Sequence, residues 1–312
     1  MQLLNLAIRL ALLVLTGFFI RKIGVVDGTF HKQLSNFLMN VCLPCLIVNS
    51  MNVDFSRQEL INCAIVVVAA LITMAVLFIV GHIGYLVFGK SVFGRVLRHG
   101  TIFPNFTFFG MPVAESLYGT QGLFYFTILT LPVRMFYYST ADLLLSGKRP
   151  NRTVKEQLKN FFSAPVVAVF VGLFFFITQI KLPTPVAQAV STMSSITSPL
   201  GMVLCGLILG DVELKTLFKK PSIFVLTLFK NIVGPAAVLG VLLLLPINDL
   251  IVRVAVVYAA APVASLLSMF TLKSTGGDTV AAAEASANTF MSTMLAVATM
   301  PMWAIILDAV LG

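Results

Sequence analysis

Charged residues are scarce in this sequence. They make up 11% of the chain, whereas 58% is hydrophobic and the mean hydropathy is +0.99. An average soluble domain has roughly 25% charged residues, so this composition excludes a soluble globular domain and indicates a membrane protein. Each membrane span needs about 20 apolar residues, and the 312-residue chain therefore has room for about ten spans and no appended domain.

Side chains that carry metal or redox chemistry are also few, with four cysteines and three histidines. Cys42 and Cys45 have the spacing of a redox motif, but their apolar helix lacks the βαβ context of that chemistry. Cys63 and Cys205 have no metal-type spacing, and the histidines form no zinc-type pair. The sequence also lacks a nucleophile paired with a base. We therefore expect no enzyme, no catalytic residue, no metal site and no bound cofactor.

The net charge is +9, and the basic residues fall in short loops between apolar runs. A nucleic-acid partner is not expected, because these residues form no single stripe. If the N-terminus is external, the outer loops hold only Arg57, Lys181 and Arg253, and the other loop lysines and arginines are cytoplasmic. This asymmetry obeys the positive-inside rule and predicts a multi-pass protein of the cell membrane with an external N-terminus. Arg9 interrupts the first apolar run, which we interpret as a span and not as a signal peptide.

The apolar runs fall into two sets of five, separated by a basic segment. The sequence predicts an N-terminal repeat over 1–146, a basic cytoplasmic linker over 147–162 and a C-terminal repeat over 163–312. The expected fold is all-α, with helices over the following ranges: 3–20, 30–49, 59–88, 96–117, 122–145, 164–180, 186–209, 222–245, 251–272 and 279–311.

Prolines recur at matching places in the two halves. Met111-Pro112-Val113-Ala114 aligns with Ala261-Pro262-Val263-Ala264, and Leu43-Pro44 aligns with Ser198-Pro199. Proline removes a backbone donor, so within a bilayer it is tolerated where protein or a water-filled cavity satisfies the freed groups. An odd number of spans per half inverts the second copy, as in many secondary carriers. We expect the fourth and ninth spans to break at Pro112 and Pro262 and to cross at a substrate site.

The stretch from Phe103 to Pro112, FPNFTFFGMP, with Leu117-Tyr118-Gly119 after it, resembles the fourth-helix motif of the auxin efflux carrier family. That family includes bacterial organic-anion carriers and the plant PIN proteins. The resemblance covers essentially the whole chain and continues at these places: Leu43-Pro44, Leu209-Gly210, Lys230 ahead of Pro235, Ala261 to Ala264 and Leu295 to Pro301. It implies two inverted five-helix repeats, as in sodium/proton antiporters and bile-acid carriers. It further implies that spans 1, 2, 6 and 7 form a scaffold and that spans 3–5 and 8–10 form a moving transport domain.

The chemistry of the crossing favours an anion. Helix N-termini at the two breaks present unpaired amides with partial positive charge, for which a carboxylate is a natural ligand. Asn105 and Thr107 add an amide and a hydroxyl before the first break, and Ser265 and Ser268 add hydroxyls after the second, although all four could instead cap the backbone. The expected substrate-binding residues are Asn105, Thr107, Gly110, Met111, Pro112, Arg134, Lys230, Ala261, Pro262 and Ser265.

Charged residues inside the membrane are functional candidates because they are costly to bury. Arg134 could clamp a substrate carboxylate, or it could pair with Glu115 or cap helix carbonyls. Lys230 could neutralise the crossing or bind substrate. Glu115 and Glu284 are candidates for proton or ion coupling, although Glu284 lies near the start of its helix and could be solvated.

We therefore expect a secondary or facilitative carrier that moves a small organic anion by elevator-type alternating access. The alternatives are a sodium- or proton-coupled antiporter or symporter of another substrate class, and a membrane sensor. The expected partners are the organic anion, the lipid bilayer and a second copy of the chain through the scaffold helices, with a sodium ion or a proton as the coupling ion.

Overall fold

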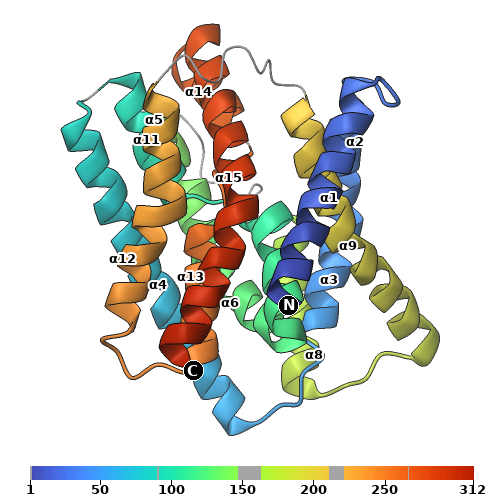
Figure 1. Cartoon of the computed structure of the whole chain (residues 1–312). Helices are drawn as coiled ribbons and strands as arrows, with labels where there is room; N and C mark the ends of the chain where they lie inside the picture. The colour runs from blue at the N-terminus through green and yellow to red at the C-terminus, as the bar shows by residue number, and fades with distance from the viewer. Residues whose placement is uncertain (1, 90, 147–162, 211–220, 266) are drawn as a thin grey trace.

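The computed structural model of the chain is all-helical over the residues that it describes, which are 2–89, 91–146, 163–210, 221–265 and 267–312 (Figure 1). Four of the described helices are long and apolar enough to cross a membrane by themselves: Arg57–Val87, Thr184–Gly210, Pro221–Leu242 and Thr279–Leu311. These findings agree with the all-α membrane protein predicted from composition. The predicted linker over 147–162 lies outside the described residues.

The first half contains α1 (Gln2–Lys22), α2 (Phe30–Phe37), α3 (Leu43–Ser50), α4 (Arg57–Val87), α5 (Val92–Ile102) and α6 (Met111–Ser146). The second half contains α8 (Ala164–Thr178), α9 (Thr184–Gly210), α11 (Pro221–Leu228), α12 (Gly234–Leu242), α13 (Asp249–Ala260), α14 (Leu267–Ser274) and α15 (Thr279–Leu311). Polar side chains begin several of them. Ser56 accepts the Glu59 N–H (3.0 Å) at the start of α4, and Asp278 accepts two N–H groups at the start of α15.

Three wide π-helical turns interrupt the helices, and each lies just before a proline. They span Leu38–Cys42, Phe106–Gly110 and Phe229–Val233, and they precede Pro44, Pro112 and Pro235. A proline ring clashes with the carbonyl four residues earlier, and a widened turn relieves that clash while the helix continues. At these three prolines the chain therefore stays helical.

The fourth span breaks at a different residue from the one predicted. Its non-helical segment covers Phe103–Asn105, between α5 and the π-turn, so Pro104 occupies the break. The prediction of a break at Pro112 is wrong, because Pro112 is the second residue of α6 and follows the widened turn. In the ninth span the break between α13 and α14 includes Pro262, as predicted.

The fourth and fifth predicted spans join without a loop. α6 runs through both, with one non-helical residue, Gly119 (φ 64°, ψ −157°), at the kink between them. A positive φ is available to glycine without steric cost, so this residue reverses the chain between two helical stretches.

The helices form two groups that α6 connects (Figure 1). α1, α2, α3, α8 and α9 lie together on the right, and α4, α5, α11, α12, α13, α14 and α15 lie on the left. α1 and α9 pack closely because glycines face each other's backbone. A Cβ atom added to Gly17 would lie 2.1 Å from the Val203 carbonyl oxygen, and one added to Gly206 would lie 1.9 Å from that of Val14.

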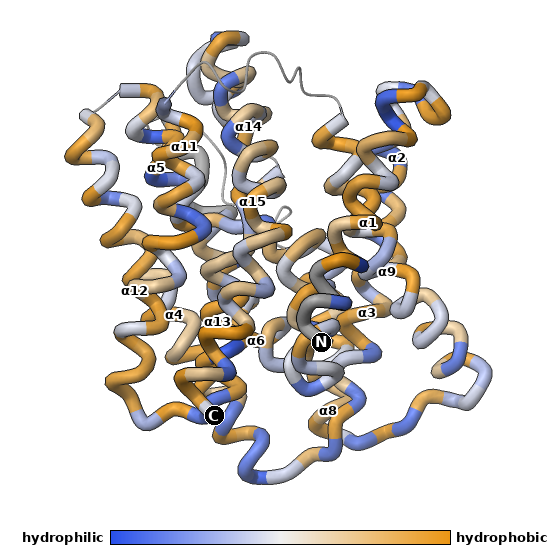
Figure 2. The backbone as a smooth tube through the Cα atoms, in the orientation of Figure 1, coloured by the Kyte–Doolittle hydropathy of each residue, from blue (hydrophilic) through white to orange (hydrophobic). Residues whose placement is uncertain are grey.

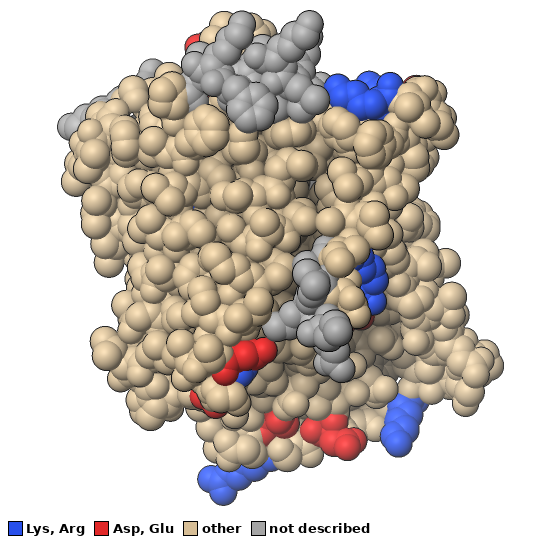
Figure 3. Space-filling model, viewed as in Figure 1, with Lys and Arg blue, Asp and Glu red and all other residues tan. Residues whose placement is uncertain are grey.

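The outer surface suits a lipid environment. Large apolar side chains are exposed along α4 and α8, for example Leu71, Ile79, Phe170 and Phe174. Hydrophobic residues continue along the helices, whereas hydrophilic residues concentrate toward the helix ends and connecting segments (Figure 2). Figure 3 shows a face that is mostly uncharged, with acidic side chains near its lower end. Exposed apolar surface of this extent indicates contact with lipid.

Candidate functional site

The two broken segments cross in antiparallel directions and bond to each other. The Asn105 N–H donates to the Pro262 carbonyl (2.6 Å), and the Ala264 N–H donates to the Phe103 carbonyl (3.2 Å). Pro104 and Val263 form the isolated antiparallel bridge between these bonds. Backbone groups freed by the two breaks thus satisfy each other, as a low-dielectric membrane interior requires.

Asn105 joins the two breaks through its side chain. Its Oδ1 accepts the Phe108 N–H (3.2 Å), and its Nδ2 donates to Ser265 Oγ (2.8 Å). The side chain therefore caps the helix that follows the first break and also reaches the second break. Asn105 is 6% exposed, and its remaining surface faces a cavity.

That cavity has a volume of 90 Å³ and lies at the crossing. Four of the expected substrate-binding residues line it, namely Asn105, Thr107, Arg134 and Ser265. The other lining residues are Met39, Pro104, Phe106, Phe108, Tyr137 and Ala264. A cavity needs about 10–15 Å³ on this measure to hold one water molecule, so this cavity has room for a ligand of several heavy atoms.

Arg134 places a buried guanidinium beside the cavity. It is 2% exposed, its central carbon lies 4.7 Å from the centre of the Phe106 ring, and its Nη2 donates to Thr107 Oγ1 (3.5 Å). Glu115, one of the partners considered for Arg134, instead accepts a hydrogen bond from Ser198. A guanidinium that stacks on an aromatic ring keeps its N–H groups in one plane, which suits bidentate binding of a carboxylate.

Lys230 lies behind the crossing and does not line the cavity. Its fully buried ammonium donates to the carbonyls of Ala259 (2.9 Å) and Thr101 (3.3 Å). These are the penultimate residues of α13 and α5, whose C-terminal ends carry partial negative charge. Lys230 therefore contacts the C-terminal ends of two helices at the crossing, and its two predicted roles stay predictions.

A network of buried hydrogen bonds connects the second break to Asn231 and to α15. The Val263 N–H donates to Ser292 Oγ (3.1 Å), and Ser292 Oγ donates to Asn231 Oδ1 (2.8 Å). The Asn231 carbonyl accepts from Trp303 Nε1 (2.8 Å). Because each of these groups is buried and bonded, the network fixes the backbone at Val263 to α15.

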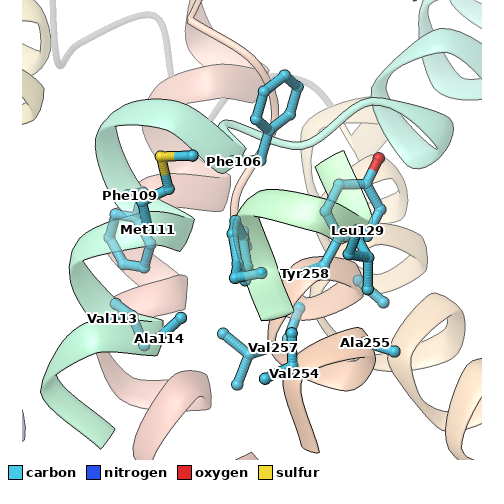
Figure 4. Packing of buried hydrophobic residues seen from close by; sticks show 14 of the residues in the cluster. Phe106, Phe109, Met111, Val113, Ala114, Leu129, Val254, Ala255, Val257 and Tyr258 are labelled. Atoms are coloured by element: carbon cyan, nitrogen blue, oxygen red, sulfur yellow. The ribbon is translucent and has the colours of Figure 1, made fainter. Parts of the chain in front are cut away.

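The expected site residues that do not line the cavity are buried elsewhere in the protein interior. Gly110 faces the Phe126 ring, which would lie 2.6 Å from an added Cβ atom. Met111 lies in the buried cluster that Figure 4 shows together with Val257 and Tyr258 of α13. A Cβ atom added to Gly201 of α9 would lie 3.7 Å from Cγ of Pro112. Ala261 and Pro262 are buried in the second break.

The candidate coupling residues lie apart from the cavity. Glu115 is bonded to Ser198 of α9, and its neighbour Ser116 accepts a hydrogen bond from Arg9 of α1 (3.3 Å). Both contacts connect α6 to the group of helices on the right in Figure 1. Glu284 is half-buried in the second turn of α15, where its carbonyl accepts the Asn288 side-chain amide (2.9 Å).

Sequence reasoning missed two parts of this region. Tyr137 lines the cavity, and its position three residues after Arg134 on the same helical face was an available signal. Glu59 at the start of α4 accepts the Tyr125 hydroxyl (2.8 Å) and the Gln121 amide (3.3 Å). The contacts of Glu59 with Tyr125 and Gln121 had no sequence signal, because these residues come from helices that are far apart in the chain.

Nearly the whole chain matches one family. A family model described as "Membrane transport protein" covers residues 3–304. The chain belongs to this family. It is the auxin efflux carrier family, which the FPNFTFFGMP stretch resembles.

Two archaeal proteins share the match. An "Uncharacterized transporter" of Methanothermobacter thermautotrophicus is 27% identical over 318 aligned residues, which cover 95% of each chain. A second "Uncharacterized transporter", from Methanocaldococcus jannaschii, is 25% identical over 268 aligned residues, which cover 82% of this chain and 84% of the relative. Membership of the membrane transport family, together with the apolar helices, makes this chain a membrane transport protein, and no enzyme family is indicated.

Proposed function

We propose that this chain is a secondary carrier that moves a small carboxylate across the cell membrane by alternating access. The observation that carries the proposal is the cavity at the crossing, with Asn105, Thr107, Arg134 and Ser265 in its lining. The helices that begin after the two breaks direct their N-terminal amides toward the crossing, and their partial positive charge adds to that of Arg134. An anion fits this surrounding, whereas a cation would face like charge.

The proposed carrier has ten membrane spans arranged as two inverted repeats. The expected spans correspond in order to α1, α2 with α3, α4, α5 with the first part of α6, the rest of α6, α8, α9, α11 with α12, α13 with α14, and α15. Breaks in the fourth and ninth spans, facing each other, are the arrangement that inverted repeats give around a midplane site.

The proposed movement is an elevator-type displacement of one helix group against the other. α1, α2, α3, α8 and α9 form the scaffold in this proposal, and α4–α6 and α11–α15 form the transport domain. Gly201 of α9 lies where the two groups meet, and an added Cβ atom there would lie 3.0 Å from the Phe108 carbonyl oxygen. The glycine lets the two groups approach closely, and the proposed displacement would break this contact together with the hydrogen bond between Ser198 and Glu115.

The proposal also includes the orientation of the chain in the membrane and its association with a second copy. We place the N-terminus outside, because Lys22 at the end of α1, Lys32 in α2 and Lys273 in α14 belong to the opposite side. A second copy of the chain binds through the scaffold helices. The coupling ion is a proton or a sodium ion, for which Glu115 and Glu284 are the acidic candidates from the sequence.

The proposal is tested by uptake of radiolabelled lactate, succinate and citrate into proteoliposomes that contain the purified chain. We expect uptake of at least one carboxylate above that of protein-free liposomes, and a decrease of about tenfold or more in Asn105→Ala and Arg134→Gln, because a hydrogen bond to a charged group contributes about 1.5–3 kcal/mol. Arg57→Gln, at an exposed helix start, is the control and should behave as wild type.

Two outcomes count against this function. If both site variants transport as well as the wild type, the anion site at the crossing is wrong. If the chain binds a carboxylate in a thermal-shift assay but moves none of them, it is a sensor and not a carrier.

A further inference from the structure

His99 occupies an unusual position beside the cavity. It lies on α5, four residues before Phe103, and its side chain has no exposed surface. Neither Nδ1 nor Nε2 has a hydrogen-bond partner among the residues that the structure describes. A buried imidazole with two unpaired nitrogens costs free energy, so packing alone does not explain a histidine at this place.

Aromatic rings from three segments surround the imidazole. The ring centres of Phe103, Tyr137 and Phe270 lie 5.0, 6.1 and 6.4 Å from that of His99. The face of an aromatic ring attracts an imidazolium, whereas its edge favours the neutral imidazole. The three rings therefore give His99 an apolar enclosure with aromatic faces as its nearest source of negative potential.

Tyr137 separates His99 from the cavity. It is a lining residue of the cavity and packs on His99, Phe103 and Phe270. Arg134 lies one turn before Tyr137 on α6 and lines the same cavity. If His99 is protonated, the ring of Tyr137 therefore lies between its positive charge and a ligand in the cavity.

Most charged groups on the helices that pack against α5 are basic. They are Arg95 and Arg98 on α5 itself, Arg134 on α6 and Lys273 on α14, whereas Glu284 on α15 is acidic and α4 contributes the titratable side chains of His82 and Tyr85. The Lys230 ammonium bonds to the Thr101 carbonyl, two residues further along α5. The side chain of Asp142, also on α6, lies outside the described residues. Neighbouring positive charges make protonation of an imidazole less favourable, and a negative charge in the cavity makes it more favourable.

We propose that His99 is the proton-binding residue of this carrier and that it takes up one proton together with the carboxylate. One ring nitrogen accepts the proton when the anion occupies the cavity, and it releases the proton on the other side of the membrane when the anion leaves. Coupling of this kind is reciprocal, so the anion promotes protonation of His99 and the proton increases the affinity for the anion. This inference rests on the proposed carboxylate carrier and names its coupling ion.

The transport test uses [¹⁴C]succinate and [¹⁴C]lactate in proteoliposomes at subsaturating concentration. For one coupled proton, lowering the external pH from about 7.5 to about 6.5 should increase the initial uptake by wild type about tenfold. In His99→Gln this increase should fall below about twofold, while exchange of labelled for unlabelled succinate at equal pH continues. His82→Gln, a half-buried histidine stacked on Phe78 of α4, should keep the wild-type response.

A second measurement decides the inference even if His99→Gln does not fold. The chain contains three histidines, so His31→Gln with His82→Gln leaves His99 as the single imidazole for ¹⁵N NMR. We expect its ring to become more protonated at constant pH when succinate or lactate is added.

The inference is overturned if His99→Gln keeps the wild-type response to pH, or if Glu115→Gln alone abolishes that response. It is also overturned if the His99 ring stays neutral between about pH 5 and 8 with and without the carboxylates, a range that spans the usual titration of histidine. The absence of any carboxylate uptake by wild type would instead contradict the proposed function, and the NMR result would still decide the state of His99.

Discussion

Lys230 shows how a single residue can make two helix breaks compatible with a membrane interior. Its ammonium lies between the carbonyls of Thr101 and Ala259, at the ends of two helices that stop in the middle of the protein. A buried ammonium is costly alone, but here its charge complements the negative ends of both helices. The residue therefore stabilises the backbone of the crossing and leaves the cavity itself to Asn105 and Arg134.

We expect Lys230→Met to destabilise the folded chain by about 1–3 kcal/mol for each carbonyl that loses its donor. The measurement is equilibrium unfolding in mixed micelles. Lys273→Met, at an exposed position near the end of α14, is the matched control and should change stability by less than about 0.5 kcal/mol. Equal effects of the two substitutions would contradict the capping role.

At the scale of helices, the prolines explain which features of the fold the sequence could predict. The repeated proline positions located the fourth and ninth spans as the unusual ones, and the span over 279–311 has the predicted bounds. Pro112 misled the prediction because a proline disturbs only the turn before it, and the π-turn at Phe106–Gly110 absorbs that disturbance. Pro104 occupies the real break, and its partner Val263 comes from a distant part of the chain.

Part of the candidate site could also be predicted from the sequence. Asn105 and Arg134 could be singled out because polar residues are rare in apolar spans, and both line the cavity. The contacts of Lys230 could not be predicted, since Thr101 and Ala259 lie 129 and 29 residues away in sequence. No local pattern encodes which helix ends meet at one ammonium.

The contact between α1 and α9 allows a test at this scale. An added Cβ atom at Gly206 would lie 1.9 Å from the Val14 carbonyl oxygen, which is backbone and cannot rotate away. Gly206→Ala should force the helices apart and cost about 1–3 kcal/mol, as overpacked cores do. Gly240→Ala is the control, because no heavy atom lies within 4 Å of its added Cβ on α12 and alanine favours helix.

Stability is again measured by unfolding in mixed micelles. A Gly206→Ala protein as stable as Gly240→Ala would contradict a close contact between α1 and α9 in the folded chain.

For the molecule as a whole, composition and charge determine how the chain lies in the bilayer. Apolar side chains are exposed along α4 and α8, and the charged residues concentrate in loops and helix ends. The positive-inside rule assigns a side to each loop only when every span is counted correctly. The order of the described helices supports the proposed count, and labelling from either side of the membrane tests it.

We expect single cysteines at Lys22 and Lys273 to be labelled from the cytoplasmic side, and those at Asp54 and Lys181 from the external side. All four positions are exposed. The background replaces the four native cysteines, which form no disulfide, with alanine, and a membrane-impermeant maleimide is added to intact cells and to inverted vesicles. Labelling of the Lys22 and Asp54 positions from the same side would contradict the proposed topology, as would opposite sides for the basic segments over 90–98 and 148–159.

The reciprocal backbone bonds at the crossing have a consequence for the transport cycle. Because Asn105 bonds to Pro262 and Ala264 bonds to Phe103, the breaks need no bound anion to satisfy their donors and acceptors. If the chain is the proposed carrier, the unloaded protein therefore keeps these bonds at the crossing during its return. We then expect net flux of the substrate, with no second anion needed for the return step.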